Sequence, residues 1–372
     1  MDQRNNILFV IDSLNYGGAQ THLIDLVNRL SSEFRPAILL LSERTELASR
    51  IKPSIEIHKE VRRWRYDFGL TRRIASYIVQ EKYHKYFVTS SFAFFFLCAT
   101  RKKLGRNFPV HFILHSSQIL NYRDRLRRFF FFRYKQPQDI FISTCQFQVE
   151  YVSKTCRIPV TQFQTIYNGI DTEGFTLSPT SFNAEEFKAA LGIPSTAKII
   201  LQVATLRKEK AHHYSVEALK ILHESGTEKP YLLFVGGGNE SLEKHLHQLT
   251  SKLDLEQYVK FCGMQKDLRP YYWISDLFTL SSIAIETFSI SALGAMASGL
   301  PCVLTDVGGA REMVTDGVNG FVVPTHDPRR LAEGWRKVLN GSISMRSENI
   351  RKMVEEKFSI DAMMHSYEAL IQ

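Results

Sequence analysis

The stretch from Leu280 to Pro324 constrains the fold of this chain more than any other. A loop that carries one carboxylate, Glu286, precedes a short helix of small residues, predicted from about Ser289 to Ser298. A buried strand at Pro301–Thr305, a glycine turn and another short strand follow. Because free N–H groups and the helix dipole attract anions to the start of a helix, the stretch predicts an anion site beside a single acid.

Short apolar runs alternate with helical patterns in two series. The first series opens with a strand at Ile7–Ile11, a glycine loop and a helix at Thr21–Leu30, and the second opens with a strand at Lys198–Val203. Such alternation is typical of parallel sheets covered by helices. We therefore predict an α/β fold with two facing Rossmann-like parallel-sheet domains, and a C-terminal helix that crosses back to the first. The predicted segments are an N-terminal domain at 1–172, a connection at 173–194, a C-terminal domain at 195–358 and the crossover helix at 359–372.

Composition indicates a folded protein of a reducing compartment. The chain has 372 residues, of which 44% are hydrophobic and 23% charged. Its five cysteines are scattered, without the spacing of a disulfide framework or a zinc site. The apolar run near the N-terminus is too short for a signal peptide, and Tyr86–Thr100 is shorter than the roughly 20 residues that cross a bilayer. We therefore expect a cytoplasmic protein.

Positive charge is concentrated in the first half. Residues 1–180 contain 26 Lys and Arg against 15 Asp and Glu, whereas residues 181–372 contain 21 against 23. Arginines interleaved with aromatic residues suit an anionic lipid surface or a nucleic acid. The alternative is that these are solvated helix faces, with Phe129–Phe132 turned to the core. The candidate membrane or acceptor-lipid residues are Arg62, Arg63, Trp64, Arg127, Arg128 and Arg133.

Polar and glycine residues follow several predicted strands, where ligands bind in open α/β sheets. Gly18 follows the first strand, His115 ends a later one, and Arg207 with Lys210 follows the first strand of the second series. Fixed cations there would neutralise a diphosphate. Each feature also has an ordinary explanation, namely a turn, a structural histidine or a solvated charged loop. The position of Glu286 before the small-residue helix is the most specific of these signals.

Taken together, these features resemble the retaining glycosyltransferases of family 4, also called glycosyl transferases group 1, which have the GT-B architecture. The resemblance spans nearly the whole chain. It depends on the order and spacing of the following segments: Gly17–Gln20, His115, Ile166–Asp171, Val203–Lys210, Phe234–Gly238, Phe261–Gly263, Glu286–Ile290, Ala295–Pro301, Gly308–Glu312 and Asn319–Pro324.

The resemblance implies a sugar-nucleotide donor held mainly by the second domain and an acceptor that enters from the first. Glu286 would bind hydroxyls of the donor sugar, and His115 would contact that sugar; these two are the candidate catalytic residues. The implied diphosphate residues are Gly18, Arg207, Lys210, Phe288, Ser289 and Ile290. The implied nucleotide and ribose region contains Gly236, Gly237, Cys262, Gly263 and Gly294.

The resemblance also implies a mechanism without metal or other cofactor, because cationic side chains and a helix terminus stabilise the departing diphosphate. Retention of configuration would follow from front-face attack, since a double displacement needs two carboxylates across the bond and the sequence offers one.

Two positions depart from the family pattern. Thr205 stands where the family commonly has an arginine, and Gly294 stands where it has a second glutamate that grips the ribose. Losing that acceptor weakens donor binding by about 1–3 kcal/mol if nothing replaces it.

We expect a retaining transferase that moves a hexose-type sugar from a UDP- or GDP-sugar to a glycan acceptor. That acceptor is expected to be lipid-linked, in surface polysaccharide or lipopolysaccharide biosynthesis at the inner face of the cytoplasmic membrane, without a nucleic-acid partner. The main alternative is a catalytically impaired sugar-nucleotide-binding homologue that acts as a scaffold or partner subunit. A third possibility, a nucleic-acid-binding α/β protein, leaves the motifs of the second half unexplained.

Overall fold

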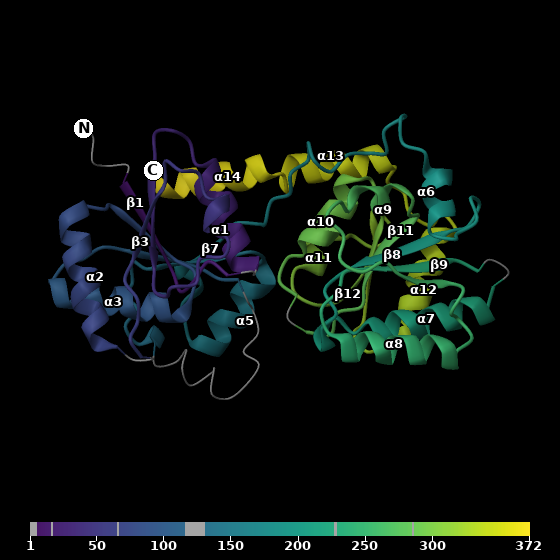
Figure 1. Cartoon of the computed structure of the whole chain (residues 1–372), viewed down its shortest axis with the longest axis horizontal. Helices are drawn as coiled ribbons and strands as arrows, with labels where there is room; N and C mark the ends of the chain where they lie inside the picture. Colours follow the sequence, from purple (N-terminus) through teal and green to yellow (C-terminus); the bar gives the residue numbers. More distant parts are fainter. Residues whose placement is uncertain (1–5, 16–17, 65–66, 116–130, 227–228, 285) are drawn as a thin grey trace. The chain divides into compact units, whose positions relative to one another are not determined.

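The computed structural model describes residues 6–15, 18–64, 67–115, 131–226, 229–284 and 286–372. The chain divides into two compact units (Figure 1). Unit 1 comprises residues 1–166 and 364–372, and unit 2 comprises residues 167–363. The chain therefore leaves unit 1, builds unit 2 and then returns, which confirms the prediction that the final helix crosses back.

Unit 1 is built on a parallel sheet. Its described strands are β1 (Asn6–Ile11), β2 (Arg35–Leu40), β3 (Glu56–Lys59), β4 (Lys85–Val88), β5 (Val110–Ile113), β6 (Ile140–Ser143) and β7 (Phe163–Thr165). Their order in the sheet is β3-β2-β1-β4-β5-β6-β7, and every pair is parallel. Because Ile7 to Ile11 are at most 2% exposed, helices must cover both faces of this sheet.

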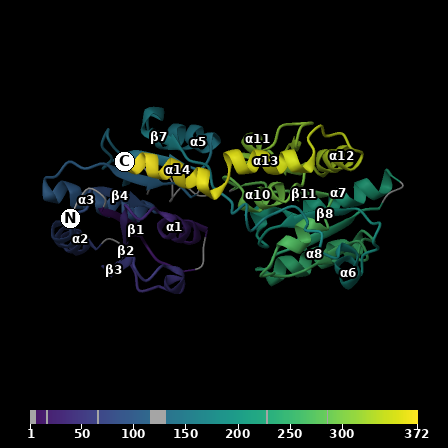
Figure 2. The same cartoon turned by 90° about the horizontal axis from the view of Figure 1, so that it is seen from above.

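Two groups of helices provide that cover. The described helices of unit 1 are α1 (Gly18–Arg29), α2 (Phe68–Glu81), α3 (Ser91–Leu104), α5 (Gln146–Cys156) and part of α14 (Ile360–Ile371). The face with Leu8 and Val10 shares a core with α2 and α3. Figures 1 and 2 show α1 and α14 together on the other side of the strands. Phe131 and Phe132 are buried in the α2 and α3 core, which confirms the core interpretation for these two residues.

Unit 2 repeats this plan. Its strands are β8 (Ile199–Val203), β9 (Tyr231–Val235), β10 (Val259–Phe261), β11 (Leu277–Leu280), β12 (Cys302–Thr305) and β13 (Gly320–Val323), in the order β10-β9-β8-β11-β12-β13. Its described helices are α6 (Ala184–Ala190), α7 (His212–Glu224), α8 (Glu240–Lys252), α9 (Arg269–Trp273), α10 (Ile290–Ala297), α11 (Ala310–Met313), α12 (Pro328–Leu339) and α13 (Ser347–Lys357). Residues of α7, α8 and α12 share one core with the sheet, centred on the fully buried Trp335. The predicted fold of two parallel-sheet α/β domains is therefore confirmed.

A buried ion pair fastens the end of α3 to the strand that follows. The Arg101 guanidinium donates to Asp139 Oδ2 at 3.0 Å, and the two side chains are 1% and 0% exposed. Asp139 Oδ1 also accepts the Val110 N–H of β5 at 2.9 Å.

Within the described ranges, none of the helices has both the length and the apolar character that crossing a bilayer requires.

Replacing Arg101 by Leu should lower the free energy of unfolding by about 3–5 kcal/mol, because Asp139 would remain buried and charged without its partner. Lys102→Leu, at the exposed neighbouring position, should stay within about 0.5 kcal/mol of the wild type. Urea denaturation monitored by circular dichroism measures both. Equal losses in the two variants would contradict a stabilising role for the buried pair.

Candidate functional site

Lys210 and Glu286, far apart in sequence, meet at the carboxyl edge of the unit 2 sheet. Lys210 ends a short 3-10 helix, η4 (Lys208–Lys210), after β8, and Glu286 follows β11. The Lys210 ammonium donates to Glu286 Oε2, which also accepts from Ser282 Oγ at 3.1 Å. The two charged side chains are 18% and 17% exposed. The structure therefore holds a cation and an acid together at the edge where parallel sheets bind ligands.

Hydrogen bonds tie the loop after β11 to the loop after β8. The Ile283 N–H donates to the Glu209 carbonyl at 2.9 Å. Ser281 Oγ lies 3.0 Å from the Lys210 carbonyl oxygen and 3.1 Å from that of Ala211. These contacts fix the backbone on both sides of the Lys210–Glu286 pair, so its position follows from the packing of β8 beside β11.

The glycine turn after β12 supports the same loop from the other side. Gly308 has φ +61°, and a Cβ atom there would lie 2.2 Å from the Glu286 carbonyl oxygen. The next residue, Gly309, donates its N–H to the Thr287 carbonyl oxygen at 2.6 Å. Only glycine allows this backbone-to-backbone approach.

The start of α10 is fixed by two further contacts. Ser289 caps the helix, with its Oγ accepting from the Ala292 N–H at 3.4 Å. Asn168 Nδ2 donates to the Phe288 carbonyl oxygen at 3.0 Å. The structure thus places Phe288, Ser289 and Ile290 at the entrance of the helix that follows Glu286.

Sequence reasoning missed the supporting roles of Ser282, Asn168 and the Gly308–Gly309 turn. The last two lie in segments that carry the family resemblance, Ile166–Asp171 and Gly308–Glu312, but nothing in a sequence shows which backbone group a side chain reaches. Proximity between a glycine turn and a carboxylate loop appears only when β11 and β12 are paired.

The predicted nucleotide residues gather at the ends of β9 and β10. Gly236 has φ +136°, and its N–H donates to the Gly263 carbonyl oxygen at 2.8 Å. Arg207, whose side chain is 67% exposed, lines a hollow of about 540 Å³ together with Gly237 and Thr205. The structure therefore brings Arg207 and the glycine loop to one opening, although Thr205 occupies the position of the missing family arginine.

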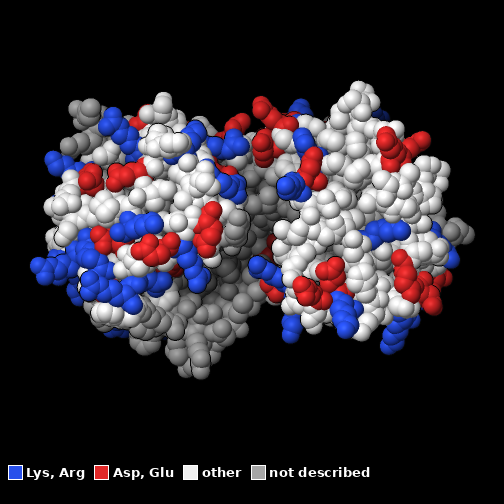
Figure 3. Space-filling model, viewed as in Figure 1, with Lys and Arg blue, Asp and Glu red and all other residues white. Residues whose placement is uncertain are grey.

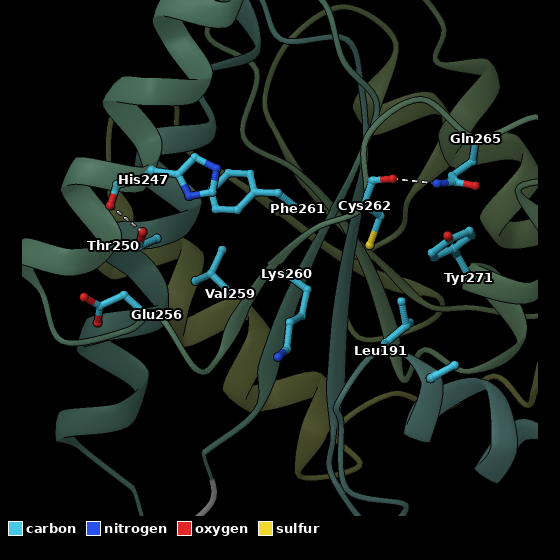
Figure 4. A pocket seen from close by; sticks show the side chains of 11 residues that line it. Leu191, His247, Thr250, Glu256, Val259, Lys260, Phe261, Cys262, Gln265 and Tyr271 are labelled. Carbon is cyan, nitrogen blue, oxygen red and sulfur yellow. Dashed lines mark hydrogen bonds between the residues drawn. The ribbon is translucent and has the colours of Figure 1, made fainter.

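Cys262 lines a separate hollow of about 480 Å³ at the edge strand β10 (Figure 4). Gln265 Nε2 donates to the Cys262 carbonyl oxygen at 2.5 Å, and the ring of Phe261 packs on His247 with centroids 4.0 Å apart. Burial raises the pKa of the Cys262 thiol to about 11. The thiol therefore stays protonated at neutral pH and is a wall of the hollow rather than a nucleophile.

Gly294 lies within α10 and is buried. A Cβ atom there would be 3.2 Å from Tyr272 Oη and 3.5 Å from a ring carbon of Phe175. Tyr272 is fully buried and donates to the Ser291 carbonyl oxygen at 3.0 Å. The tyrosine hydroxyl and Phe175 thus crowd the space that a larger side chain at this position would enter.

His115 and Gly18 belong to unit 1. His115 packs edge-on against His22 of α1, with ring centroids 5.0 Å apart, and Tyr367 of α14 lies against the other side of His22 at 5.9 Å. His115 Nε2 and His22 Nδ1 are buried and have no hydrogen-bond partner among the residues that the structure describes. Burial lowers the pKa of His22 to about 4, and burial together with His22 holds the pKa of His115 well below its usual value. Both imidazoles are therefore neutral at pH 7.

The candidate membrane residues differ in their surroundings. Arg63, Trp64 and Arg133 are exposed, and Trp64 is 61% exposed. Arg62 is largely buried and lies 3.5 Å from Asp12 Oδ1. Arg127 and Arg128 lie outside the described residues.

Two family models match the chain. "Glycosyltransferase Family 4" covers residues 16–174, and "Glycosyl transferases group 1" covers residues 183–356. N-acetyl-alpha-D-glucosaminyl L-malate synthase of Bacillus anthracis is 31% identical over 57% of this chain and 54% of its own length. The lipopolysaccharide core biosynthesis glycosyltransferase LpsE of Rhizobium meliloti is 28% identical over 50% of this chain and 52% of its own. The chain thus spans about half the length of these curated relatives.

Solved structures extend the likeness to the whole fold. Anabaena Alr3699/HepE in complex with UDP has a TM-score of 0.85 at 20% identity, covering 98% of this chain and 99% of that chain. The same protein in complex with UDP-glucose gives a TM-score of 0.79 at 22% identity, with the same coverage. At these identities the match shows a shared fold.

Acid should destabilise the protein partly through His22. Its pKa is about 6.5 unfolded and about 4 folded, so between these values the unfolded chain binds a proton that the folded chain does not. Stability is therefore lost as the pH falls from about 6.5 towards 4. In His22→Phe, the loss between pH 7 and pH 4.5 should be smaller by about 2 kcal/mol, as measured by urea denaturation at both pH values. An unchanged pH dependence would contradict this assignment.

Restoring the family glutamate at Gly294 should not improve nucleotide binding. The crowding by Tyr272 and Phe175 predicts that Gly294→Glu lowers stability by about 1–3 kcal/mol without tightening UDP, as measured by thermal unfolding and calorimetry. Adding Tyr272→Phe, which removes the nearest atom, should recover part of the loss. Tighter UDP binding at unchanged stability in the single variant would show that the site accepts the acid.

Proposed function

This chain belongs to the GT-B glycosyltransferases of group 1, and on that premise we propose that it transfers a sugar from a nucleotide-sugar donor to a glycan acceptor. The donor is a UDP- or GDP-sugar, and the transferred group is a hexose-type sugar. The likeness to a fold that binds UDP and UDP-glucose in HepE supports this choice of donor class.

The pairing of Lys210 with Glu286 is the observation that carries the proposal. Each charge neutralises the other while no donor is bound. A donor diphosphate competes for the Lys210 ammonium, because its two phosphates together carry two negative charges and a carboxylate carries one. Glu286 is then released to accept hydrogen bonds from hydroxyls of the donor sugar. The Lys210–Glu286 pair thus supplies one residue to the diphosphate and one to the sugar, on either side of the bond that breaks.

Additional positive charge stabilises the leaving diphosphate. Arg207 stands at the mouth of the glycine-loop hollow, and the N–H groups at Phe288–Ile290 begin α10. Gly18 begins α1 of unit 1, and no atom of the described residues lies within 4 Å of a Cβ position there, which leaves room for a phosphate. We propose that these groups act without a metal ion and that the reaction retains configuration by front-face attack.

His115 supplies a neutral hydrogen-bonding group from unit 1. Because its charged form is disfavoured by burial and by His22, it adds no positive charge beside the sugar ring, where an oxocarbenium-like centre develops. We assign it to binding of the donor sugar.

The acceptor is proposed to be a lipid-linked glycan, used in surface polysaccharide or lipopolysaccharide biosynthesis. LpsE, a relative over half of this chain, is a lipopolysaccharide core biosynthesis enzyme. Figure 3 shows Lys and Arg gathered over α2 and α3 of unit 1, where Arg72, Lys82, Lys102 and Lys103 are exposed. Such a surface attracts anionic lipid. The proposed location is the cytoplasmic face of the inner membrane, by peripheral contact.

A catalytically impaired homologue is the second candidate, favoured by the crowding at Gly294. Position 294 is a glycine and so offers no acid to hold a ribose, and Tyr272 Oη would lie 3.2 Å from a Cβ atom there. Such a protein would still bind a sugar nucleotide but would act as a scaffold or partner subunit.

Turnover of UDP- and GDP-sugars, followed as nucleotide release, distinguishes the two candidates. For an enzyme, Glu286→Ala and Lys210→Ala should each lower kcat by at least about 100-fold, since each removes a charge that acts at the reacting bond. Glu333→Ala, an exposed acid on α12, is the matched control and should behave as wild type. Measurable nucleotide binding with no turnover of any donor would instead support the impaired homologue.

A further inference from the structure

Arg62 reaches across the carboxyl ends of several strands of unit 1. Its backbone N–H donates to the carbonyl oxygen of Leu41, the residue after β2, at 3.1 Å. Its guanidinium Nη2 lies 3.5 Å from Oδ1 of Asp12, the residue after β1. The guanidinium carbon lies 4.7 Å from the ring centroid of Phe92, in the first turn of α3 after β4. One cation is therefore placed at the edge where open α/β sheets bind ligands.

The Arg62 side chain is held in place but not hydrogen-bonded. It is only 21% exposed, and its distance to Asp12 exceeds the range of a good hydrogen bond. Among the described residues, no side-chain hydrogen bond of Arg62 is found. Arg73, on α2, by contrast makes three side-chain hydrogen bonds, donating to Glu60, Asp67 and the Val61 carbonyl oxygen at 2.8–3.0 Å. A largely buried guanidinium whose N–H groups find no acceptor among the described residues can bind an acceptor on a ligand.

The charges around Arg62 leave it able to bind an anion. Asp12 is the acid in contact with it, and the nearby acids Glu60 and Asp67 are already paired with Arg73. Phe92 packs against the flat face of the guanidinium. The edge of the guanidinium carries the N–H groups, which can donate to two oxygens of one phosphate or carboxylate. The first turn of α3 contains no acid that would repel such a group.

We propose that Arg62 determines acceptor specificity by binding an anionic group, a phosphate or carboxylate, of the acceptor. This inference rests on the proposed transferase function and narrows the acceptor to an anionic glycan or glycolipid. Such a group could come from a soluble sugar phosphate or from a lipid-linked diphosphate. A membrane surface is a poorer match, because a flat array of headgroups meets exposed side chains such as Arg63 rather than one that is largely buried.

Calorimetric titration of the full chain, with UDP saturating the donor site, tests the inference. The probes are glucose 1-phosphate, farnesyl diphosphate and the uncharged methyl glucoside and farnesol. The wild type should bind at least one anionic probe and neither neutral one. Arg62→Gln should weaken that binding about 10- to 100-fold, and Arg62→Lys, which keeps the charge but loses the planar fork, should weaken it less. Preference for one of the two anionic probes identifies the source of the charge.

Arg63→Gln is the matched control, since it removes the same charge from the neighbouring exposed position and should change probe affinity less than about threefold. Co-sedimentation with phosphatidylglycerol vesicles examines the membrane. Equal loss of vesicle binding in both variants, with probe binding unchanged, would overturn the inference, as would equal affinity of wild type and folded Arg62→Gln for every probe.

Donor turnover by the wild type, measured alongside, separates this inference from the proposed function. Arg62-dependent anion binding without turnover of any donor would support the anion site and count against the transferase. Turnover without any Arg62-dependent binding would leave the transferase standing and overturn the acceptor assignment.

Discussion

A hydrogen bond from the Gly309 N–H to the Thr287 carbonyl oxygen determines where the acid of this protein stands. The loop that carries Glu286 has no regular structure of its own, so its shape depends on the turn after β12. Gly308 allows the approach because it has no Cβ atom to meet the Glu286 carbonyl. Lys210, Ser282 and the start of α10 are all positioned relative to this backbone. The site is therefore assembled from loops that follow three adjacent strands, β8, β11 and β12.

The same arrangement reduces the free-energy cost of burying charged side chains. Lys210 and Glu286 are both largely buried, and either alone would be costly to remove from water. Paired, each offsets part of the cost of burying the other. His115 and His22 avoid the cost of a buried charge in another way, because each remains neutral at pH 7. Unit 2 thus holds a charged pair, and unit 1 holds a pair of neutral imidazoles.

Much of the fold was predictable because it depends on local periodicity. Strands β1, β8 and β12 begin within one residue of their predicted starts and end where predicted, and α10 differs by one residue at each end because Ser289 and Ser298 are caps. Helix α1 begins at Gly18 rather than Thr21, since the glycine loop enters the helix earlier than the apolar spacing indicates.

The site was less predictable, because spacing identifies residues but not what they touch. Lys210 and Glu286 were singled out from sequence, whereas their contact depends on β8 pairing with β11. Arg62 was grouped with Arg63 as surface charge, and only burial against Phe92 and Asp12 separates the two. The roles assigned to these residues from family resemblance remain predictions.

The division of the chain has a consequence for its synthesis. Residues 364–372 belong to unit 1, where Tyr367 packs on His22 and Glu368 accepts the Ser31 N–H. On the ribosome these residues emerge only after all of unit 2 has been made. Unit 2 can therefore complete its core first, although its sequence begins later. Until then α1 of unit 1 lacks its contacts with α14. The contact between Tyr367 and His22, the residue beside His115, therefore forms last.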